Sequence, residues 1–494
     1  MKLDTGTELP DNLELTKEFK DTFNLIDNTN TNLFITGKAG SGKSTLLEYF
    51  RQNTKKNFIT LAFQGITAIK AKGQTIHSFF KFPPHFISQQ DIKILKDKDL
   101  INRLDTILID EISLVRADLF DAIDVSLKMN RGNDEPFGGV QVVVFGDVMQ
   151  LDPIIGKTDE EIMQKFYPEG VYFFNANCFT EGNLQNIELT KNFRQKDKSF
   201  IDLLNSIRTG SVDEKKLSFL NNRTVTIDDL PKETIILAPT NRKVDDINFS
   251  HLYQLKTPTF NYDAVVKGTF KEKEYPVEKN LKLKVGAQIM ITKNDTDIPQ
   301  KWVNGTLGTI QSLSKDKIKI LIDNKSYYLG KAKWDKYEYK FSGNRVDTSI
   351  KGSFIQYPIK LAWATTIHKS QGQTFEKVAI DLDTGAFAHG QTYVALSRAK
   401  SLEGIYLLNK INKKDIIFDK KVLDFVNNKS VVKKVTKKKT QKNIKIESPI
   451  NWSTRDDNKL IALYKRNVPE IALSKMFKKT ISQVRERIIY LMKK

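Results

Sequence analysis

A glycine-rich stretch near the N-terminus has residue types and a spacing that suit phosphate binding. Residues 37–44 read Gly-Lys-Ala-Gly-Ser-Gly-Lys-Ser and fit the pattern G-x-x-x-x-G-K-[ST], between an apolar run and a helical segment. Glycines let successive backbone N–H groups point at phosphate oxygens beside a helix N-terminus. Lys43 would reach the β and γ phosphates, and Ser44 would offer its hydroxyl to Mg²⁺. The predicted nucleotide site comprises Gly37, Ala39, Gly40, Ser41, Gly42, Lys43, Ser44 and Thr45.

Two later apolar runs are expected to bring acidic and amide groups to the same site. Asp110 and Glu111 close the run at residues 106–109, and Gln150 follows the run at 140–145. At the carboxyl end of a parallel strand such side chains face the ligand. Asp110 is therefore predicted to bind Mg²⁺, Glu111 to act as general base toward the attacking water, and Gln150 to sense the γ-phosphate. Solvated surface charges are the alternative, which the position after a buried strand disfavours.

The scaffold that positions these residues is expected to be an α/β fold. Residues 32–62 read as strand, glycine-rich loop, helix and strand, which is a βαβ unit. With the two later runs they predict one α/β domain over residues 1–190. Three more apolar runs, separated by helical stretches, predict a second α/β domain that is split into residues 191–280 and 354–410. These runs lie at 235–238, 378–380 and 404–408.

The remaining segments have other patterns. Between 281 and 353, apolar residues alternate with polar ones around an Asn-Gly turn, which predicts a small β-barrel inserted in the second domain. Lysines crowd residues 411–449, which predicts a basic linker. Residues 450–494 carry apolar positions at helical spacing and predict three short helices.

The overall charge points to a polyanionic partner. The 494 residues include 79 Lys and Arg against 59 Asp and Glu, a formal net charge of +20. Basic side chains that neutralise phosphates release counterions, so nucleic acid is the expected partner, with a merely solvated basic surface as the alternative. The single cysteine, Cys178, rules out an internal disulfide. No apolar run is long enough to span a bilayer, so we expect no membrane partner and a cytoplasmic location.

Seven segments after the glycine-rich loop carry motifs in a fixed order. They lie at residues 110–115, 136–141, 146–151, 192–195, 237–241, 364–374 and 393–399. In residues and order they resemble the motifs of the PIF-type (petite-integration-frequency) helicases of superfamily one, class B. The resemblance covers about residues 10 to 410. The Pro-Phe-Gly-Gly segment at 136–139 favours this family over its RecD-like and Dda-like relatives.

The resemblance, together with the helical tail, implies a fold class and an activity. The fold would be α/β, with two RecA-like P-loop NTPase domains, an inserted small SH3-like β-barrel and a C-terminal three-helix module. The activity would be ATP-dependent 5′ to 3′ translocation on single-stranded DNA with unwinding of duplex DNA, in the family's settings of DNA repair, recombination and telomere maintenance. Arg194 and Arg398 would reach the γ-phosphate, since a guanidinium is a planar fork suited to phosphoryl oxygens. The expected catalytic residues are Lys43, Glu111, Gln150, Arg194 and Arg398, with ATP and Mg²⁺ as cofactors.

Motif positions also imply contacts with nucleic acid. Hydroxyl, imidazole and amide side chains in two motifs suit phosphates and sugars. The expected nucleic-acid-binding residues are Thr75, His77, Ser78, Thr366, His368 and Gln371. We expect a monomer that acts on single-stranded and forked DNA.

Departures from the family pattern bear on the base and on one loop. Phe19 stands where the family has an adenine-reading glutamine, and we hypothesise that its ring stacks on any purine, so that GTP would be hydrolysed as well as ATP. The segment 62–68, Ala-Phe-Gln-Gly-Ile-Thr-Ala, departs from the usual Ala-Pro-Thr-Gly-Ile-Ala, which leaves strand contacts there open. Asp152 replaces a proline, and nothing in the sequence explains the change.

The tail and the activity each leave an alternative open. Residues 452–494 resemble a Myb or SANT-type module, in which Thr480 or Ser482 would cap a last helix that presents Arg485, Arg487 and Lys493 to duplex DNA; a packing module is the alternative. For the whole chain, the alternative to a helicase is an ATP-dependent single-strand translocase or remodeller that acts on RNA–DNA hybrids or protein–DNA complexes. A nucleic-acid-binding protein without catalysis is a third reading, and the intact motif residues argue against it.

Overall fold

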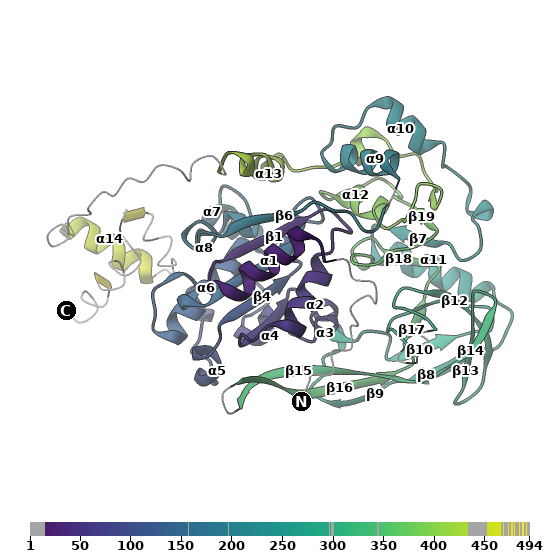
Figure 1. Ribbon diagram of the computed structural model, residues 1–494, viewed down its shortest axis with the longest axis horizontal. Coiled ribbons are helices and arrows are strands. Elements are labelled where there is room, and N and C mark those ends of the chain that lie inside the picture. Colours follow the sequence, from purple (N-terminus) through teal and green to yellow (C-terminus); the bar gives the residue numbers. More distant parts are fainter. Residues whose placement is uncertain are drawn as a thin grey trace.

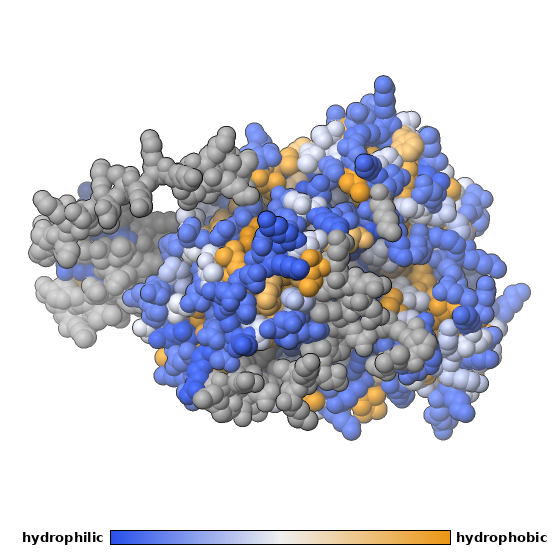
Figure 2. All heavy atoms as spheres, viewed as in Figure 1, coloured by the Kyte–Doolittle hydropathy of each residue, from blue (hydrophilic) through white to orange (hydrophobic). Residues whose placement is uncertain are grey.

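The chain forms two α/β domains and an all-β unit. The computed structural model describes residues 15–432 except 157, 196, 296, 298–300 and 343–344, and part of 452–491. Figure 1 shows the two α/β domains side by side, with the β unit along one side of both and helix α13 on the opposite side. Polar and charged side chains cover most of the described surface on the face in Figure 2. None of the helices in the described part of the chain has the length and apolarity needed to cross a membrane.

The first domain is built on a parallel sheet of six strands. All its pairings are parallel, and β1 and β5 are buried along their whole length, which is why their sequences are continuous apolar runs. The strands in spatial order are β3 (Gln74–Thr75), β2 (Phe58–Ala62), β4 (Thr106–Asp110), β5 (Gln141–Gly146), β1 (Leu33–Gly37) and β6 (Gln185–Leu189). The helices are α1 (Lys17–Asn28), α2 (Lys43–Asn53), α3 (Gly65–Lys70), α4 (Ile76–Phe80), α5 (Lys98–Asn102), α6 (Ala117–Arg131), α7 (Glu160–Phe166) and α8 (Asn177–Glu181).

The Pro-Phe-Gly-Gly segment fastens α6 to β5. Phe137 and Gly138 both lie in the left-handed region, with φ of 55° and 62°. The backbone N–H of Phe137 donates to Oδ1 of Asp124 at 2.6 Å, and its ring is fully buried. A Cβ on Gly138 would lie 2.8 Å from the carbonyl oxygen of Leu127, so only glycine fits. The segment thereby fixes where β5 starts relative to α6.

The second domain has a smaller parallel sheet. Its strands in spatial order are β18 (Ala364–Thr366), β7 (Ile235–Ala238), β19 (Val378–Ile380) and β20 (Ile405–Leu407). Its helices are α9 (Lys198–Arg208), α10 (Glu214–Asn221), α11 (Asn241–Gln254) and α12 (Gln391–Leu396). The three apolar runs predicted as strands are β7, β19 and β20, which confirms the expected α/β class of this part of the chain.

The all-β unit is larger than the insertion expected at 281–353. Strands outside those limits pair with strands inside them: β8 with β10, β9 with β16, and β17 with β11. These flanking strands are short, and their partners are distant in the sequence, so no local pattern marks them. The strands are β8 (Phe260–Asp263), β9 (Val265–Gly268), β10 (Asn280–Leu283), β11 (Gln288–Ile291), β12 (Leu307–Leu313), β13 (Ile318–Ile322), β14 (Lys325–Leu329), β15 (Ala332–Ser342), β16 (Arg345–Gln356) and β17 (Ile359–Leu361).

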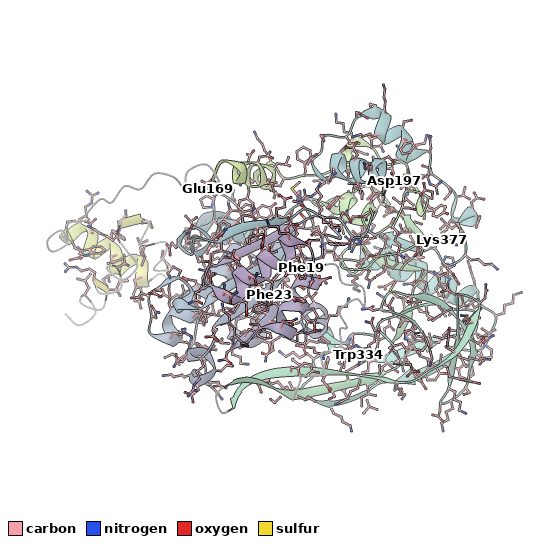
Figure 3. The ribbon with its side chains drawn as sticks, in the orientation of Figure 1. Phe19, Phe23, Glu169, Asp197, Trp334 and Lys377 are labelled. Atoms are coloured by element: carbon pink, nitrogen blue, oxygen red, sulfur yellow. The ribbon has the colours of Figure 1, made fainter. Side chains whose placement is uncertain are left out.

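The long hairpin of β15 and β16 connects this unit to the first domain. It contacts α3 and α5. Ile69 of α3 packs against the apolar cluster of the β unit that contains Trp334 and Phe354. Trp334 lies on β15 below the first domain in Figure 3. The β unit therefore contacts the first domain, although in sequence it is inserted in the second.

Part of the expected basic linker is helical. Within residues 411–449, helix α13 (Lys420–Val432) follows a short turn, and its residues Val422, Leu423 and Phe425 pack on the first domain. The lysine-rich composition of the region hides this apolar face, because Lys420 and Lys421 precede it and Lys429 follows it. Residues 433–451 lie outside the described residues.

The tail is described in part. Helix α14 (Thr454–Lys465) contributes Leu460 to a buried apolar cluster with Val484 and Ile488. Arg487, expected to face DNA, instead pairs with Asp457, with 2.7 Å between Nη2 and Oδ2. The other expected DNA-facing or capping residues, Thr480, Ser482, Arg485 and Lys493, lie outside the described residues.

The close packing of the Pro-Phe-Gly-Gly segment at 136–139 leads to a stability prediction. Gly138→Ala should destabilise the protein by about 2 kcal/mol more than Gly132→Ala, because both sites are left-handed but only Gly138 faces a backbone oxygen. Thermal denaturation of both variants measures the difference, which we expect as a drop in Tm several degrees larger for Gly138→Ala. Equal decreases in Tm for the two variants would show that the contact with Leu127 does not affect stability.

Candidate active site

The loop between β1 and α2 has the conformation of an anion-binding loop. Gly40 and Gly42 lie in the left-handed region, with φ of 84° and 88°. The buried hydroxyl of Ser41 has no hydrogen-bond partner within the described structure. Nζ of Lys43 donates to the carbonyl oxygen of Gly37 at 2.6 Å. A buried unpaired hydroxyl and an ammonium group at the N-terminus of α2 fit a phosphate group, as the sequence pattern predicts.

Two carboxyl groups at the end of β4 face this loop. Glu111 has a left-handed backbone, with φ of 51°, and its N–H donates to Oδ1 of Asp110 at 2.9 Å. Burial raises the pKa of Asp110 to about 7; the charge of Glu111 adds to the shift and Lys43 opposes it. Burial also raises the pKa of Glu111. A strained backbone and a raised carboxyl pKa are typical of residues that accept protons or bind cations.

The donor set suits a cation that arrives with a nucleotide. Among the described residues, no three His, Cys, Asp or Glu side chains gather into a metal site of their own. Ser44 at the start of α2 and Asp110 at the end of β4 are hard oxygen donors on neighbouring segments, which suits Mg²⁺ that keeps phosphate and water ligands.

Arg194 and Arg398 lie together at the interface between the domains. Nη1 of Arg194 donates to the carbonyl oxygen of Ser397 at 3.1 Å, and a Cβ on Gly40 would lie 2.5 Å from Cβ of Arg194. Arg398 is 1% exposed, and burial followed by the charge of Arg194 lowers its pKa to about 9. Neither arginine has a carboxylate partner among the ion pairs of the described residues. A buried and a half-buried like charge beside a phosphate-type loop indicate an anion site.

Further residues that sequence reasoning did not select join the two domains here. Arg208 at the end of α9 pairs with the fully buried Asp147, with 2.8 Å between Nη2 and Oδ1. Burial opposes ionisation of Asp147, but Arg208 and Lys43 outweigh it and lower the pKa of this carboxyl. The backbone N–H of Ala39 donates to the hydroxyl of Tyr393 at 3.3 Å. Tyr393 lies in a recognised motif, whereas nothing local to Arg208 marks it.

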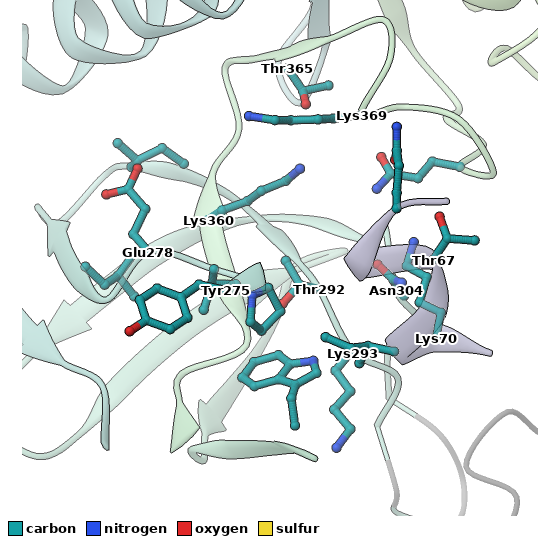
Figure 4. A pocket seen from close by; sticks show the side chains of 18 of the residues that line it. Thr67, Lys70, Tyr275, Glu278, Thr292, Lys293, Asn304, Lys360, Thr365 and Lys369 are labelled. Carbon is teal, nitrogen blue, oxygen red and sulfur yellow. The ribbon is translucent and has the colours of Figure 1, made fainter. Parts of the chain in front are cut away.

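A large cleft opens between the two α/β domains and the β unit. Its volume is about 1610 Å³, and it is lined from all three parts of the chain. Figure 4 shows Lys70 on α3, Lys360 on β17 and Lys369 after β18 along its walls. Burial lowers the pKa of Lys360 to about 8, and the charges of Lys70 and Lys369 add to the shift. The lysines that line the cleft are Lys70, Lys72, Lys279, Lys282, Lys293, Lys333, Lys360 and Lys369.

The expected nucleic-acid residues fall into two groups. His368 and Gln371 line the cleft, and Nε2 of Gln371 lies 3.5 Å from Oε1 of Gln150. Thr366 instead accepts the backbone N–H of Lys369 at 3.1 Å, within its own turn. The residues at the start of α4 do not line the cleft. There, Thr75 caps the helix by accepting the N–H of Ser78, and the ring of His77 packs edge-on against Phe63.

The hypothesis that the ring of Phe19 stacks on a purine is wrong, whereas hydrolysis of GTP as well as ATP stays a prediction. The side chain of Phe19 is 4% exposed and packs edge-on against Tyr49, with 5.4 Å between ring centroids. It belongs to the apolar core that α1 and α2 form with the sheet of the first domain. Figure 3 shows Phe19 together with Phe23 on α1. Helical periodicity places Phe19 on the apolar face of α1, so its ring is not free to stack on a base.

The ion pair between Asp147 and Arg208 leads to a prediction on pH. Because the pKa of Asp147 is lowered in the folded protein, its pairing stabilises the fold above the carboxyl's ordinary pKa and is lost as pH falls. Arg208→Met should therefore lower Tm at neutral pH by the equivalent of about 3 kcal/mol, and the gap in Tm to wild type should narrow only as pH falls below the ordinary carboxyl pKa of 3.8, where wild-type Asp147 takes up its proton. Arg208→Lys, which keeps the charge, is the control. A gap in Tm that stays constant as pH falls below 3.8 would contradict the assignment.

Comparisons with known proteins agree with these features. Residues 14–218 match the model of the PIF1-like helicase family. The chain is 33% identical to the ATP-dependent DNA helicase Pif1 of Campylobacter jejuni, over 77% of this chain and 90% of that one. The match to the Bdellovibrio bacteriovorus protein of the same name is 31%, over 84% and 92% of the two chains.

Solved structures extend the match to the fold. The Pif1 of a Bacteroides species in complex with ADP-AlF4 is 39% identical, with a TM-score of 0.79, over 85% of this chain and 98% of that one. The Bacteroides protein bound to ssDNA has the same identity and coverage but a TM-score of 0.63. Both α/β domains thus have the RecA-like arrangement of these enzymes. By sequence, fold and motif order, this chain belongs to the PIF1-like helicase family.

Proposed function

We propose that this chain is an ATP-dependent DNA helicase that moves 5′ to 3′ on single-stranded DNA and unwinds duplex DNA. One observation carries the proposal: the nucleotide site and the lysine-lined cleft share residues. Glu111 and Gln371 both line the cleft, and Gln371 contacts Gln150 beside the nucleotide loop. A change at one site therefore alters the walls of the other, which is what a nucleotide-driven motor on a strand requires.

The roles that we assign in the nucleotide site follow from its charges. Lys43, Arg194 and Arg398 neutralise the phosphates: Arg398 is buried, Lys43 and Arg194 are half-buried, and none of the three has a full counter-charge. Glu111, with its raised carboxyl pKa, accepts the proton of the attacking water. Gln150 reports the state of the γ-phosphate to Gln371. Ser44 and Asp110 would hold Mg²⁺ together with the nucleotide, and the ion would supply further neutralisation of phosphate charge.

The cleft is our candidate for the path of the single strand. Its lysines suit phosphates, and the rings of Phe249, Tyr275 and Trp334 in its lining suit stacked bases. We infer that the β unit corresponds to the SH3-like subdomain of the family. The Bacteroides structure with ssDNA fits this chain less well than the one with ADP-AlF4, at 0.63 against 0.79, which supports a DNA-free domain arrangement here.

Other inferences extend the proposal. A solved Pif1 structure that is 39% identical to this chain concerns unwinding at forked duplex DNA by two coordinating helicases, which favours forked DNA as a substrate and makes the expected monomer a point to test. The C-terminal three-helix module as a duplex-binding unit and the cytoplasmic location stay predictions. The expected domain limits at 190 and 410 also stay predictions.

Lys43→Ala tests the motor. We expect the variant to bind single-stranded DNA but to lose ATP hydrolysis by at least about a thousandfold, because the ammonium group that stabilises the transferred phosphoryl group is gone. Hydrolysis with and without DNA, and unwinding of forks with a 5′ or a 3′ tail, are the measurements. Lys55→Ala, exposed in the same domain, is the control. DNA-stimulated hydrolysis without unwinding would favour a translocase or remodeller, and unwinding from a 3′ tail would refute the polarity.

Lys360 tests the strand path. Because the pKa of Lys360 is about 8, its ammonium group in the DNA-free protein loses its proton as pH rises from 7 to 9. A bound phosphate favours the protonated form of the side chain. Affinity for a single strand should therefore fall as pH rises through 8. Lys360→Arg should bind with a flatter pH profile, since arginine stays charged. Titrations of labelled single strands measure this, and identical profiles for the two proteins would place the strand elsewhere.

A further inference from the structure

The chain crosses between the two α/β domains a second time at Asp419. Before this point it follows the second domain: the carbonyl oxygen of Ile417 accepts the N–H of Gly390 at 3.0 Å. The ring of Phe418 lies so close to Gly210, also in the second domain, that a Cβ there would be 2.2 Å from it. After this point the chain is α13, which packs on the first domain.

Helix α13 is docked on the first domain by apolar contacts. Val422 is fully buried in that domain's core. The ring of Phe425 stacks on Phe174 with 4.0 Å between centroids and 7° between planes, and it meets Phe179 edge-on. Figure 1 shows α13 lying over the side of the first domain that carries α7 and α8. A segment that follows the second domain is thus part of the core of the first.

Hydrogen bonds at the crossing point connect both domains. The hydroxyl of Tyr172, in the first domain, donates to Oδ2 of Asp419 at 2.7 Å. The N–H of Asp419 donates to Nδ1 of His389 at 2.8 Å, so the imidazole proton lies on Nε2, which donates to the carbonyl oxygen of Val148 at 3.2 Å. His389 is 3% exposed and stands directly before Gly390 and α12.

Asp152, unexplained by the sequence, joins this group. Its Oδ1 lies 3.2 Å from the hydroxyl of Tyr172, which has a single proton and gives it to Asp419. Burial raises the pKa of Asp152, although its hydrogen bond with Tyr172 opposes the shift. The contact of this carboxyl group with the Tyr172 hydroxyl is one that a proline could not make.

We propose that α13 and the hydrogen bonds of Tyr172, Asp419 and His389 form a tether that positions α12 against the nucleotide loop. Helix α12 carries Tyr393, whose hydroxyl meets Ala39, and leads to Arg398. Val148, at the other end of the network, lies two residues before Gln150. The three residues of the tether are positioning residues, since none of them lies in the nucleotide loop or the cleft. The proposal rests on the proposed function, because ATP hydrolysis is its readout.

Tyr172→Phe and Asp419→Ala test the tether in the full chain. Both break the bond between the domains without a large cavity. We expect KM for ATP to rise about fivefold with kcat within twofold, because a looser interface populates the nucleotide-binding arrangement less. Amide hydrogen exchange at residues 420–427 should become faster. Asp419→Asn, which keeps an acceptor for Tyr172, should restore KM to within twofold of wild type.

Tyr167→Phe is the matched control. Its hydroxyl donates to Asp121 at 2.9 Å, the same kind of bond, but both residues belong to the first domain. An unchanged KM in Tyr167→Phe, with the expected rise in Tyr172→Phe, supports the tether. An equal rise in both, or no rise in Tyr172→Phe and Asp419→Ala, overturns it. Absence of hydrolysis in the wild type would instead refute the proposed function, so the two failures are distinct.

Discussion

Buried charge at the interface between the two α/β domains is the constraint on which the rest of the structure depends. Lys43, Arg194, Arg208 and Arg398 converge there, and Arg208 is neutralised by the buried Asp147. Isolated charges are costly to bury, so the interface is at its most stable when an anion lies between the domains. The positive charge at the interface therefore favours closure of the two domains around a nucleotide.

The same interface reaches the lysine-lined cleft. Glu111 belongs to both sites, and Gln371 joins the cleft to Gln150. Because packed interfaces switch between discrete arrangements and do not deform smoothly, a small change near Gln150 is expected to move whole elements. The hairpin of β15 and β16, which bridges the β unit and the first domain, is the element that most directly shapes the opposite wall of the cleft.

Family motifs in this chain serve two physical purposes. Some hold reactive groups, as the glycine-rich loop and the end of β4 do. Others fix elements in place: the Pro-Phe-Gly-Gly segment clasps α6 to β5, and Thr75 and Thr366 cap turns with their hydroxyls. A motif residue can therefore be needed for activity without touching a ligand. Where this chain departs from the family, at Phe19 and Asp152, the side chains are used in packing and in an interdomain network.

The sequence by itself determined the nucleotide loop, the family, and the strands β1, β2, β4, β5, β7, β19 and β20, because each depends on short-range patterns: glycines that permit left-handed φ, a helix N-terminus, and apolar runs buried on both faces. Tertiary structure alone decided what depends on distant partners. It buried Phe19, paired Arg208 with Asp147, turned Arg487 toward Asp457, and docked α13 on the other domain. Neighbours that are far away in sequence determine whether a polar or aromatic side chain contacts a ligand, a counter-charge or a core. Local sequence patterns therefore do not predict these contacts.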